Sequence, residues 1–209
     1  MTDAAALQAL RDLKAASGDI PVPIVSEIVL QTNQYELMKA WYEGVFAANW
    51  IAETSPKGPP QGDRTGVGGK QVFATDVRAS FMRLPQSVTF AIFELTHLKT
   101  SPDKDPGINH MQVKYPDMET LIRRLEVLRD YGVHPHRSSN HGPATSFYFR
   151  DPDENIVELC VYNFESPAEM AAFAASPQFK ANPSGVALDR DDFISRYRSG
   201  EPLESLLAM

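Results

Sequence analysis

The chain has 209 residues, of which 43% are hydrophobic, so it can bury one sizeable core or two small fused cores. Its formal net charge of −7 argues against nucleic acid and anionic membrane as partners, because either requires clustered lysine and arginine. The single cysteine, Cys160, excludes an intramolecular disulfide and, with no basic secretory leader and no apolar stretch of membrane-spanning length, predicts a cytoplasmic protein.

The first predicted elements are a helix, a strand and a second helix. Residues 4–16 have an amphipathic helical pattern and form an N-terminal extension that ends at residue 23. Residues 24–30 are β-branched and apolar, which is typical of a strand. Asn33 followed by Glu36 is a capping-box pattern for the next helix. Apolar side chains at helical spacing predict the buried side of that helix: Leu37, Met38, Trp41, Tyr42 and Val45.

Breaker residues then separate further strands. Residues 55–69 are rich in proline and glycine and are typical of a loop. Strands are predicted over residues 79–82 and 89–95. Residues 99–107 are polar and contain two prolines and a glycine, which indicates a linker.

After the linker the same order begins again. Residues 108–113 predict a strand, Asp117 can cap the helix that follows, and Gly132 can end it. The apolar stripe of this helix contains Met118, Leu121, Ile122, Leu125 and Leu128. Two more strands are expected over residues 146–149 and 156–162, and they are joined by a turn.

These patterns predict an α+β fold in which a strand-helix-strands order occurs twice. Aligning residue 25 with residue 108 superimposes strand on strand and helix on helix. The predicted organisation divides the chain as follows: an N-terminal extension over 1–23, a first module over 24–98, a linker over 99–107, a second module over 108–164 and a helical tail over 165–209.

One stretch carries a resemblance to a known family. Residues 140–159 read NHGPATSFYFRDPDENIVEL and resemble the end of the catalytic module of type I extradiol dioxygenases. These small enzymes belong to the vicinal oxygen chelate superfamily, and the resemblance implies its fold, two β-α-β-β-β modules that form a curled sheet around a cavity. Residues 107–110 and 182–189 extend the resemblance, so that it covers residues 24 to about 203.

The resemblance implies a metal-dependent oxygenase. In that family two histidines and one glutamate on strands hold a ferrous ion inside the cavity, and it implies that His110 and Glu158 fill two of these positions. It also places His141 and Tyr148 where side chains hydrogen-bond the hydroxyls of the substrate. The implied partners are an aromatic diol and dioxygen, and we expect a homo-oligomer, a dimer or larger.

The physical chemistry of these residues agrees with a metal role. Glu158 interrupts an apolar run, and a carboxylate buried there requires a cation or hydrogen bonds. An imidazole and a carboxylate with open coordination positions suit Fe(II) or a similar divalent ion.

The sequence also departs from the family pattern. Glu27 stands where the family has its first histidine ligand, so the predicted metal site is Glu27, His110 and Glu158. This ligand set leaves Mn(II) and Zn(II) open beside Fe(II). No histidine occupies residues 86–89, where the family has its acid–base catalyst, and His97 is the nearest substitute.

Three functions are compatible with this pattern. The first is an extradiol-type dioxygenase acting on a catechol-like or polycyclic dihydroxyaromatic compound. The second is a metal-dependent isomerase, lyase or cyclase, in which Glu27 and Glu94 matter more than dioxygen. The third is a non-catalytic binding protein that keeps the cavity and has lost the metal.

A further departure from the family pattern is Glu154 in place of a turn glycine, so that Asn155 is expected to adopt the positive φ.

Overall fold

The computed structural model of the protein describes residues 25–56, 77–96, 98–99, 108–182 and 184–208, together with residues 8, 11 and 12. The predicted N-terminal helix lies outside the described residues except for those three, which are helical. Most of the predicted loop and linker, and His97, also lie outside them. Among the described residues, no helix has both the length and the apolar character needed to cross a membrane.

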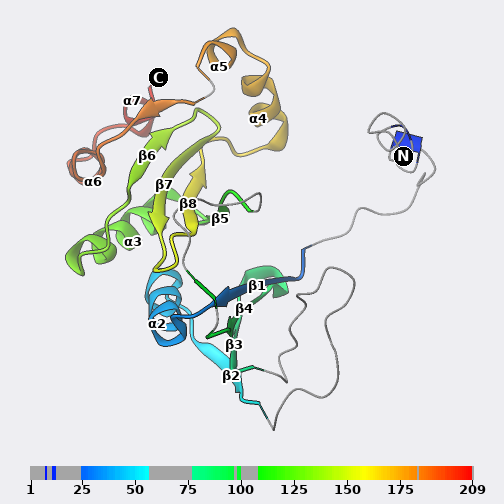
Figure 1. Cartoon of the computed structure of the whole chain (residues 1–209). Helices are drawn as coiled ribbons and strands as arrows, with labels where there is room; N and C mark the ends of the chain where they lie inside the picture. Colours follow the sequence, from blue (N-terminus) through cyan, green and yellow to red (C-terminus); the bar gives the residue numbers. More distant parts are fainter. Residues whose placement is uncertain are drawn as a thin grey trace.

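The fold is mixed α+β with two separate sheets, one of four strands and one of five (Figure 1). The first sheet has the strand order β1-β4-β3-β2, in which β1 is parallel to β4 and the other pairs are antiparallel. This part of the chain contains β1 (Glu27–Thr32), α2 (Tyr35–Phe46), β2 (Trp50–Thr54), β3 (Ala79–Arg83), the short 3-10 helix η1 (Pro85–Ser87) and β4 (Thr89–Glu94).

The second sheet repeats this arrangement and gains one strand from the tail. Its order is β5-β8-β7-β6-β9, and β5 is parallel to β8 as β1 is to β4. Its elements are β5 (Met111–Lys114), α3 (Met118–Asp130), β6 (Arg137–Asn140), β7 (Ala144–Arg150), β8 (Ile156–Tyr162) and β9 (Val186–Ala187).

Helix α3 forms as its sequence predicts. The Asp117 side chain accepts a hydrogen bond from the Thr120 N–H at 2.7 Å, so it caps the helix. All five residues of the predicted stripe are buried against the sheet, and Gly132 follows the helix with φ of 76°. Cys160 is fully buried in β8, as expected for a strand interior.

Helix α2 begins differently from the prediction. Gln34 is its N-cap residue and makes no side-chain cap. The Asn33 amide instead donates to the Leu98 carbonyl at 2.8 Å, so it is not free to cap the helix. The predicted capping box is therefore wrong, and Leu37, which the prediction buries, is 55% exposed.

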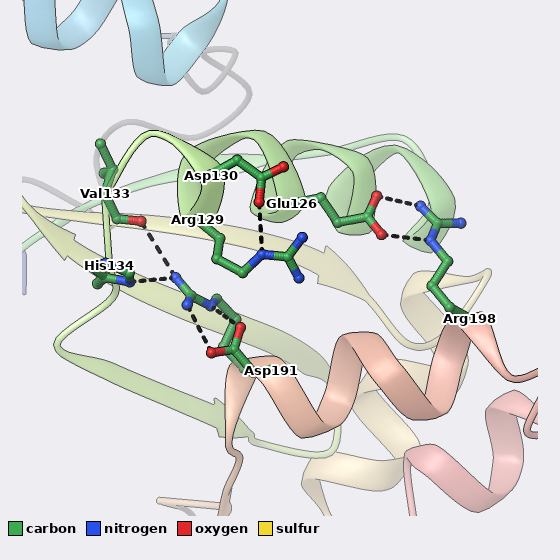
Figure 2. Close-up of polar contacts among 8 residues, drawn as sticks. Glu126, Arg129, Asp130, Val133, His134, Asp191 and Arg198 are labelled. Atoms are coloured by element: carbon green, nitrogen blue, oxygen red, sulfur yellow. Dashed lines mark hydrogen bonds and ion pairs between the residues drawn. The ribbon is translucent and has the colours of Figure 1, made fainter.

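The tail packs on the second sheet and on α3. It contains α4 (Pro167–Ala174), α5 (Pro177–Ala181), α6 (Arg190–Arg198) and α7 (Leu203–Leu206). Phe193 and Ile194 of α6 are buried in the main core. Figure 2 shows Arg198 of α6 facing Glu126 of α3, with both nitrogen–oxygen distances at 2.7 Å. These apolar and ionic contacts together attach α6 to α3.

The two helices leave one face of each sheet without a helix of its own module. Helix α2 packs on the face of β4 that carries Phe90 and Ile92, and α3 packs on the face of β8 that carries Val157 and Leu159. Because successive side chains of a strand point to opposite faces, the residues between these positions lie on the other face. We call this second surface of each sheet the open face.

Candidate metal centre

Strand register places a row of polar side chains across the open face of the second sheet. Gln112 of β5 lies opposite Glu158 of β8, which lies opposite Tyr148 of β7. Tyr148 in turn lies opposite Arg137 of β6. Residues paired in this way across neighbouring strands project from the same face. We call Gln112, Glu158, Tyr148 and Arg137 the polar row.

The Glu158 carboxylate is 3% exposed and has a different partner at each oxygen. Its Oε1 accepts hydrogen bonds from the Ser146 hydroxyl at 2.6 Å and from the Gln112 amide at 3.0 Å. Its Oε2 lies 3.1 Å from Nε2 of His110. One oxygen is thus satisfied by neutral donors, which leaves the other directed at the imidazole.

His110 lies just before β5, although the sequence predicts it inside the strand. Its Nδ1 is 2.7 Å from Oδ1 of Asn109, and this contact requires Nδ1 to carry the proton. In a neutral ring Nε2 then presents a lone pair to the Glu158 oxygen. Two lone pairs at 3.1 Å repel unless a proton or a metal ion lies between the groups.

This geometry fits two ligands of one metal ion. Metal–ligand bonds of about 2.1 Å at a right angle separate the two ligand atoms by about 3 Å. His110 and Glu158 have this separation, at 3.1 Å. A neutral imidazole and a carboxylate are also a donor set that Fe(II), Mn(II) and Zn(II) accept.

The structure does not bring Glu27 to this pair. Glu27 is exposed on β1 and lies opposite Thr89, on the open face of the first sheet. Among the described residues, no group of three or more histidine, cysteine, aspartate and glutamate side chains is placed to hold a metal ion. The role of Glu27 as a third ligand therefore stays a prediction.

Glu94 does not join Glu27 either. Glu94 lies opposite Thr32 at the end of β4, five residues after Thr89. An odd number of residues along a strand reverses the face, so Glu94 projects on the α2 side and Glu27 on the open face. Glu27 and Glu94 therefore project from opposite faces of this sheet, and a functional role for Glu94 stays a prediction.

The structure does bring His141 and Tyr148 together. His141 Nε2 is 2.9 Å from the Tyr148 hydroxyl. The Tyr148 ring also makes an edge contact with the His110 ring, with centroids 6.1 Å apart. Burial and the nearby Glu158 charge raise the pKa of Tyr148, so its hydroxyl keeps its proton at neutral pH. The four predicted residues other than Glu27 thus lie around one point of the open face.

A hydrogen-bonded clamp holds the turn that carries His141. The buried Asn140 side chain accepts from Gly142 N–H at 2.8 Å and donates to the Leu207 carbonyl at 2.9 Å. Asn163 donates to Gly142 O at 2.8 Å. Sequence reasoning missed Asn140, Asn163 and Leu207 as supporting residues. The Asn-His-Gly order is the only local signal, because Gly142 has φ of 89°.

The turn between β7 and β8 differs from its prediction in one residue. Glu154 itself adopts the positive φ, at 65°, so the expectation that Asn155 takes it is wrong. Asp151 accepts from the backbone N–H of Asp153 and Asn155 at 2.9 and 2.8 Å, which fixes the turn. The hydroxyl of Tyr42 in α2 donates to Asp151 at 2.8 Å and connects the two modules.

A hollow near these residues lies between the two first strands, β1 and β5. This cavity has a volume of about 1070 Å³, which is ample for a substituted aromatic compound. Apolar side chains of both strands line it, including Ile28, Leu30, Met111 and Val113. His110 lies on its wall, so the candidate ligand pair borders the cavity through that residue.

Comparison with known proteins identifies relatives over most of the chain. Residues 24–159 match the family model described as the Glyoxalase/Bleomycin resistance protein/Dioxygenase superfamily. Biphenyl-2,3-diol 1,2-dioxygenase 2 from Rhodococcus globerulus is 28% identical over 188 residues, which cover 88% of this chain and 86% of the relative. Biphenyl-2,3-diol 1,2-dioxygenase 3 from the same organism is 26% identical over 196 residues, 88% of this chain and 87% of the relative.

A solved structure supports the fold. The glyoxylase/bleomycin resistance protein/dioxygenase domain from Frankia sp. EAN1pec superimposes with a TM-score of 0.53 at 15% identity. The match covers 70% of this chain and 96% of that domain. At this level of identity the likeness concerns the arrangement of strands and helices.

Proposed function

Because the chain belongs to the glyoxalase/bleomycin resistance protein/dioxygenase superfamily, we propose that it is a metal-dependent dioxygenase of the extradiol type. The substrate would be a catechol-like or polycyclic dihydroxyaromatic compound, cleaved beside its hydroxyl pair. The proposal depends most on one observation, the 3.1 Å approach of His110 Nε2 to Glu158 Oε2 beside the hydrogen-bonded His141 and Tyr148. The two dioxygenases from Rhodococcus globerulus support the choice of reaction.

His110 and Glu158 would hold the metal ion in this proposal. A bound ferrous ion would supply open coordination positions for the hydroxyls of the substrate and for dioxygen. The Ser146 and Gln112 bonds to Oε1 keep the carboxylate fixed, so that Oε2 alone faces the ligand position.

Tyr148 and His141 would act on the oxygen atoms of the substrate. The raised pKa of Tyr148 keeps its hydroxyl neutral, and a neutral hydroxyl can donate a hydrogen bond to an oxygen that gains negative charge. His141 is bonded to that hydroxyl and can orient it or exchange a proton with it. These two residues would perform the proton transfer for which residues 86–89 offer no histidine.

Metal binding and oxygen consumption together test the proposal. Equilibrium dialysis of the whole chain with Fe(II) under nitrogen should show binding that His110→Gln and Glu158→Gln each weaken by about tenfold or more. Glu27→Gln is the matched control, since Glu27 is exposed and lies apart from the pair, and it should bind as the wild type does. Oxygen uptake with a panel of catechols should follow the metal occupancy.

Two results would count against the proposal. Absence of oxygen uptake by metal-loaded protein across the panel would reject the dioxygenase reaction. Equal metal affinity in the wild type, His110→Gln and Glu158→Gln would reject the ligand pair. A loss of affinity in Glu27→Gln would instead establish the three-residue ligand set that the sequence predicts.

A second candidate function is a small-molecule-binding protein without a metal. The observation that favours it is the absence of a third ligand beside the pair among the described residues. An imidazolium–carboxylate ion pair accounts for the same 3.1 Å distance. Failure of the wild type to bind any of Fe(II), Mn(II) and Zn(II), together with retained binding of catechols, would establish this function.

The predicted homo-oligomer is a separate question, which light scattering of the purified protein tests.

A further inference from the structure

Arg137 occupies the free end of the polar row. It lies opposite Tyr148 on the neighbouring strand, and its guanidinium carbon is 5.2 Å from the centre of the Tyr148 ring. The side chain therefore projects from the open face, on the same side as Glu158. On its other side, β9 pairs with residues 139 and 140 of β6, so no strand partner lies beyond Arg137.

The charge of Arg137 is not neutralised within the described part of the chain. No carboxylate there lies within ion-pair distance of it, and its one weak hydrogen bond goes to the Ser184 carbonyl at 3.4 Å. Most other arginines of the second module and tail have a carboxylate partner; Arg150, for example, pairs with Glu154. An exposed guanidinium over an aromatic ring is thus ready to accept an anion.

The groups around Arg137 have mixed charge. His136 precedes it, and its ring is 6.5 Å from the Tyr148 ring. Burial lowers the pKa of His136, the charges of Arg150 and Arg137 lower it further, and the Glu154 carboxylate raises it. Since a lowered pKa favours neutral His136 and Arg150 is paired with Glu154, the positive charge at this end of the row is that of Arg137 itself.

The spacing of the row sets a length for the ligand. Neighbouring strands lie about 4.8 Å apart, so two strand steps separate Glu158 from Arg137 by about 10 Å. Tyr148 lies midway between them. A single aromatic ring with hydroxyls at one end and a carboxylate at the other, plus one contact at each end, fills this length.

We propose that Arg137 is a specificity-determining residue that selects aromatic diols carrying an anionic group, such as a ring carboxylate, at the end away from the hydroxyl pair. This inference rests on the proposed function for the placement of the hydroxyls beside His110 and Glu158. Arg137 forms a charge-assisted, two-pronged hydrogen bond with the anionic group, and the Tyr148 ring supports the guanidinium.

Protocatechuate and its methyl ester test the proposal, because they share the ring and the diol, and at the far end one has a carboxylate and the other an uncharged methyl ester. Calorimetric titration of the whole chain with Fe(II) under nitrogen measures both affinities, and contacts common to the two probes cancel in their ratio. The wild type should bind protocatechuate at least about tenfold more tightly than the ester. Arg137→Gln should bring the ratio close to one and leave the affinity for the ester unchanged.

Two further variants separate a specific contact from a general charge effect. Arg137→Lys retains the positive charge and loses the paired N–H donors of the guanidinium, so it should retain part of the preference for protocatechuate over the ester. Arg123→Gln makes the same change in net charge on an exposed position of α3, on the far side of the sheet, and should keep the full preference. The inference is overturned if the wild type shows no preference, if Arg137→Gln weakens both probes equally, or if Arg123→Gln lowers the ratio as much.

Oxygen uptake measured on the same samples separates this inference from the proposed reaction. A preference that depends on Arg137, without oxygen uptake, supports the anion contact and rejects the dioxygenase. Oxygen uptake with both probes at equal affinity supports the dioxygenase and rejects the role of Arg137.

Discussion

Gly185 in the tail offers a sharp test of how the turn carrying His141 is supported. A methyl group at Gly185 would lie 2.2 Å from the Asn140 carbonyl oxygen and 2.7 Å from the His141 Cα. Both neighbours are backbone atoms, which cannot rotate away as a side chain can. Gly185→Ala must therefore displace the tail segment from β6.

The expected loss has two parts. Alanine at a φ of +76° costs about 1–2 kcal/mol, because its Cβ approaches the following carbonyl. Displacing the segment also removes the bonds of the buried Ser139 hydroxyl to the Ser184 and Val186 carbonyls, at 3.1 and 3.2 Å. Leaving that hydroxyl without a partner costs a further ~2 kcal/mol. We expect a total loss of about 3–4 kcal/mol in the free energy of unfolding.

Gly132→Ala is the matched control, because Gly132 has the same φ of +76° and no atom within 4 Å of the added methyl group. It should lose only the backbone part, about 1–2 kcal/mol. Urea titrations followed by circular dichroism give both free energies of unfolding. Equal losses in the two variants would show that the tail does not approach the His141 turn as closely as the structure describes.

Three further predictions concern the core, the cysteine and the tail. Tyr42→Phe removes the hydroxyl that donates to the buried Asp151, and it should lower the free energy of unfolding, measured by urea titration, by about 1.5–3 kcal/mol. An unchanged urea midpoint of unfolding would contradict the Tyr42–Asp151 hydrogen bond. Burial raises the pKa of the Cys160 thiol from 9.0 to about 12, so a thiol reagent at pH 8 should label it only after unfolding, and rapid labelling of the folded protein would refute this. By linkage, the contribution of Cys160 to stability is fully present below pH 9 and is lost as the pH rises through about 12. Arg198→Gln breaks exposed ion pairs with two glutamates of α3, so it should cost about 1 kcal/mol at low salt and less at high salt; a loss independent of salt would indicate packing instead.

Local patterns in the sequence predict the second module best. The stripe from Met118 to Leu128 and the cap at Asp117 depend only on residues within one helix, and both are confirmed. The strands β3, β4, β7 and β8 are likewise confirmed, because each has a long apolar or alternating run. Nothing in the sequence singles out β2 (Trp50–Thr54), since four of its five residues are exposed and it lacks a buried face.

The errors arise where a hydrogen bond that the local pattern does not reveal decides the outcome, one of them long-range and one within a turn. Asn33 has the sequence of a helix cap, but its amide bonds the carbonyl of Leu98, 65 residues away. Glu154 keeps the positive φ of the glycine it replaces, because the Asp151 bonds hold the turn around it.

The residues of the candidate site also divide into those that a sequence pattern identifies and those that only the fold identifies. The resemblance named His110, Glu158, His141 and Tyr148, and the structure places them close together. Arg137 gives no sequence signal, because its importance comes from lying across the strand from Tyr148.

The parallel pairing of β5 with β8 has a consequence for the order of folding. Strands β6, β7 and β8 follow one another in the chain and can pair through short turns. Strand β5 pairs with residues of β8 that lie 46 positions later in the chain, so its pairing closes a longer loop. His110 immediately precedes β5, so we expect it to meet Glu158 only after β6, β7 and β8 have paired. A metal ion bound by His110 and Glu158 would stabilise the pairing of the edge strand β5 with β8. Removal of the ion with a chelator should therefore allow β5 to unfold before the rest of the sheet.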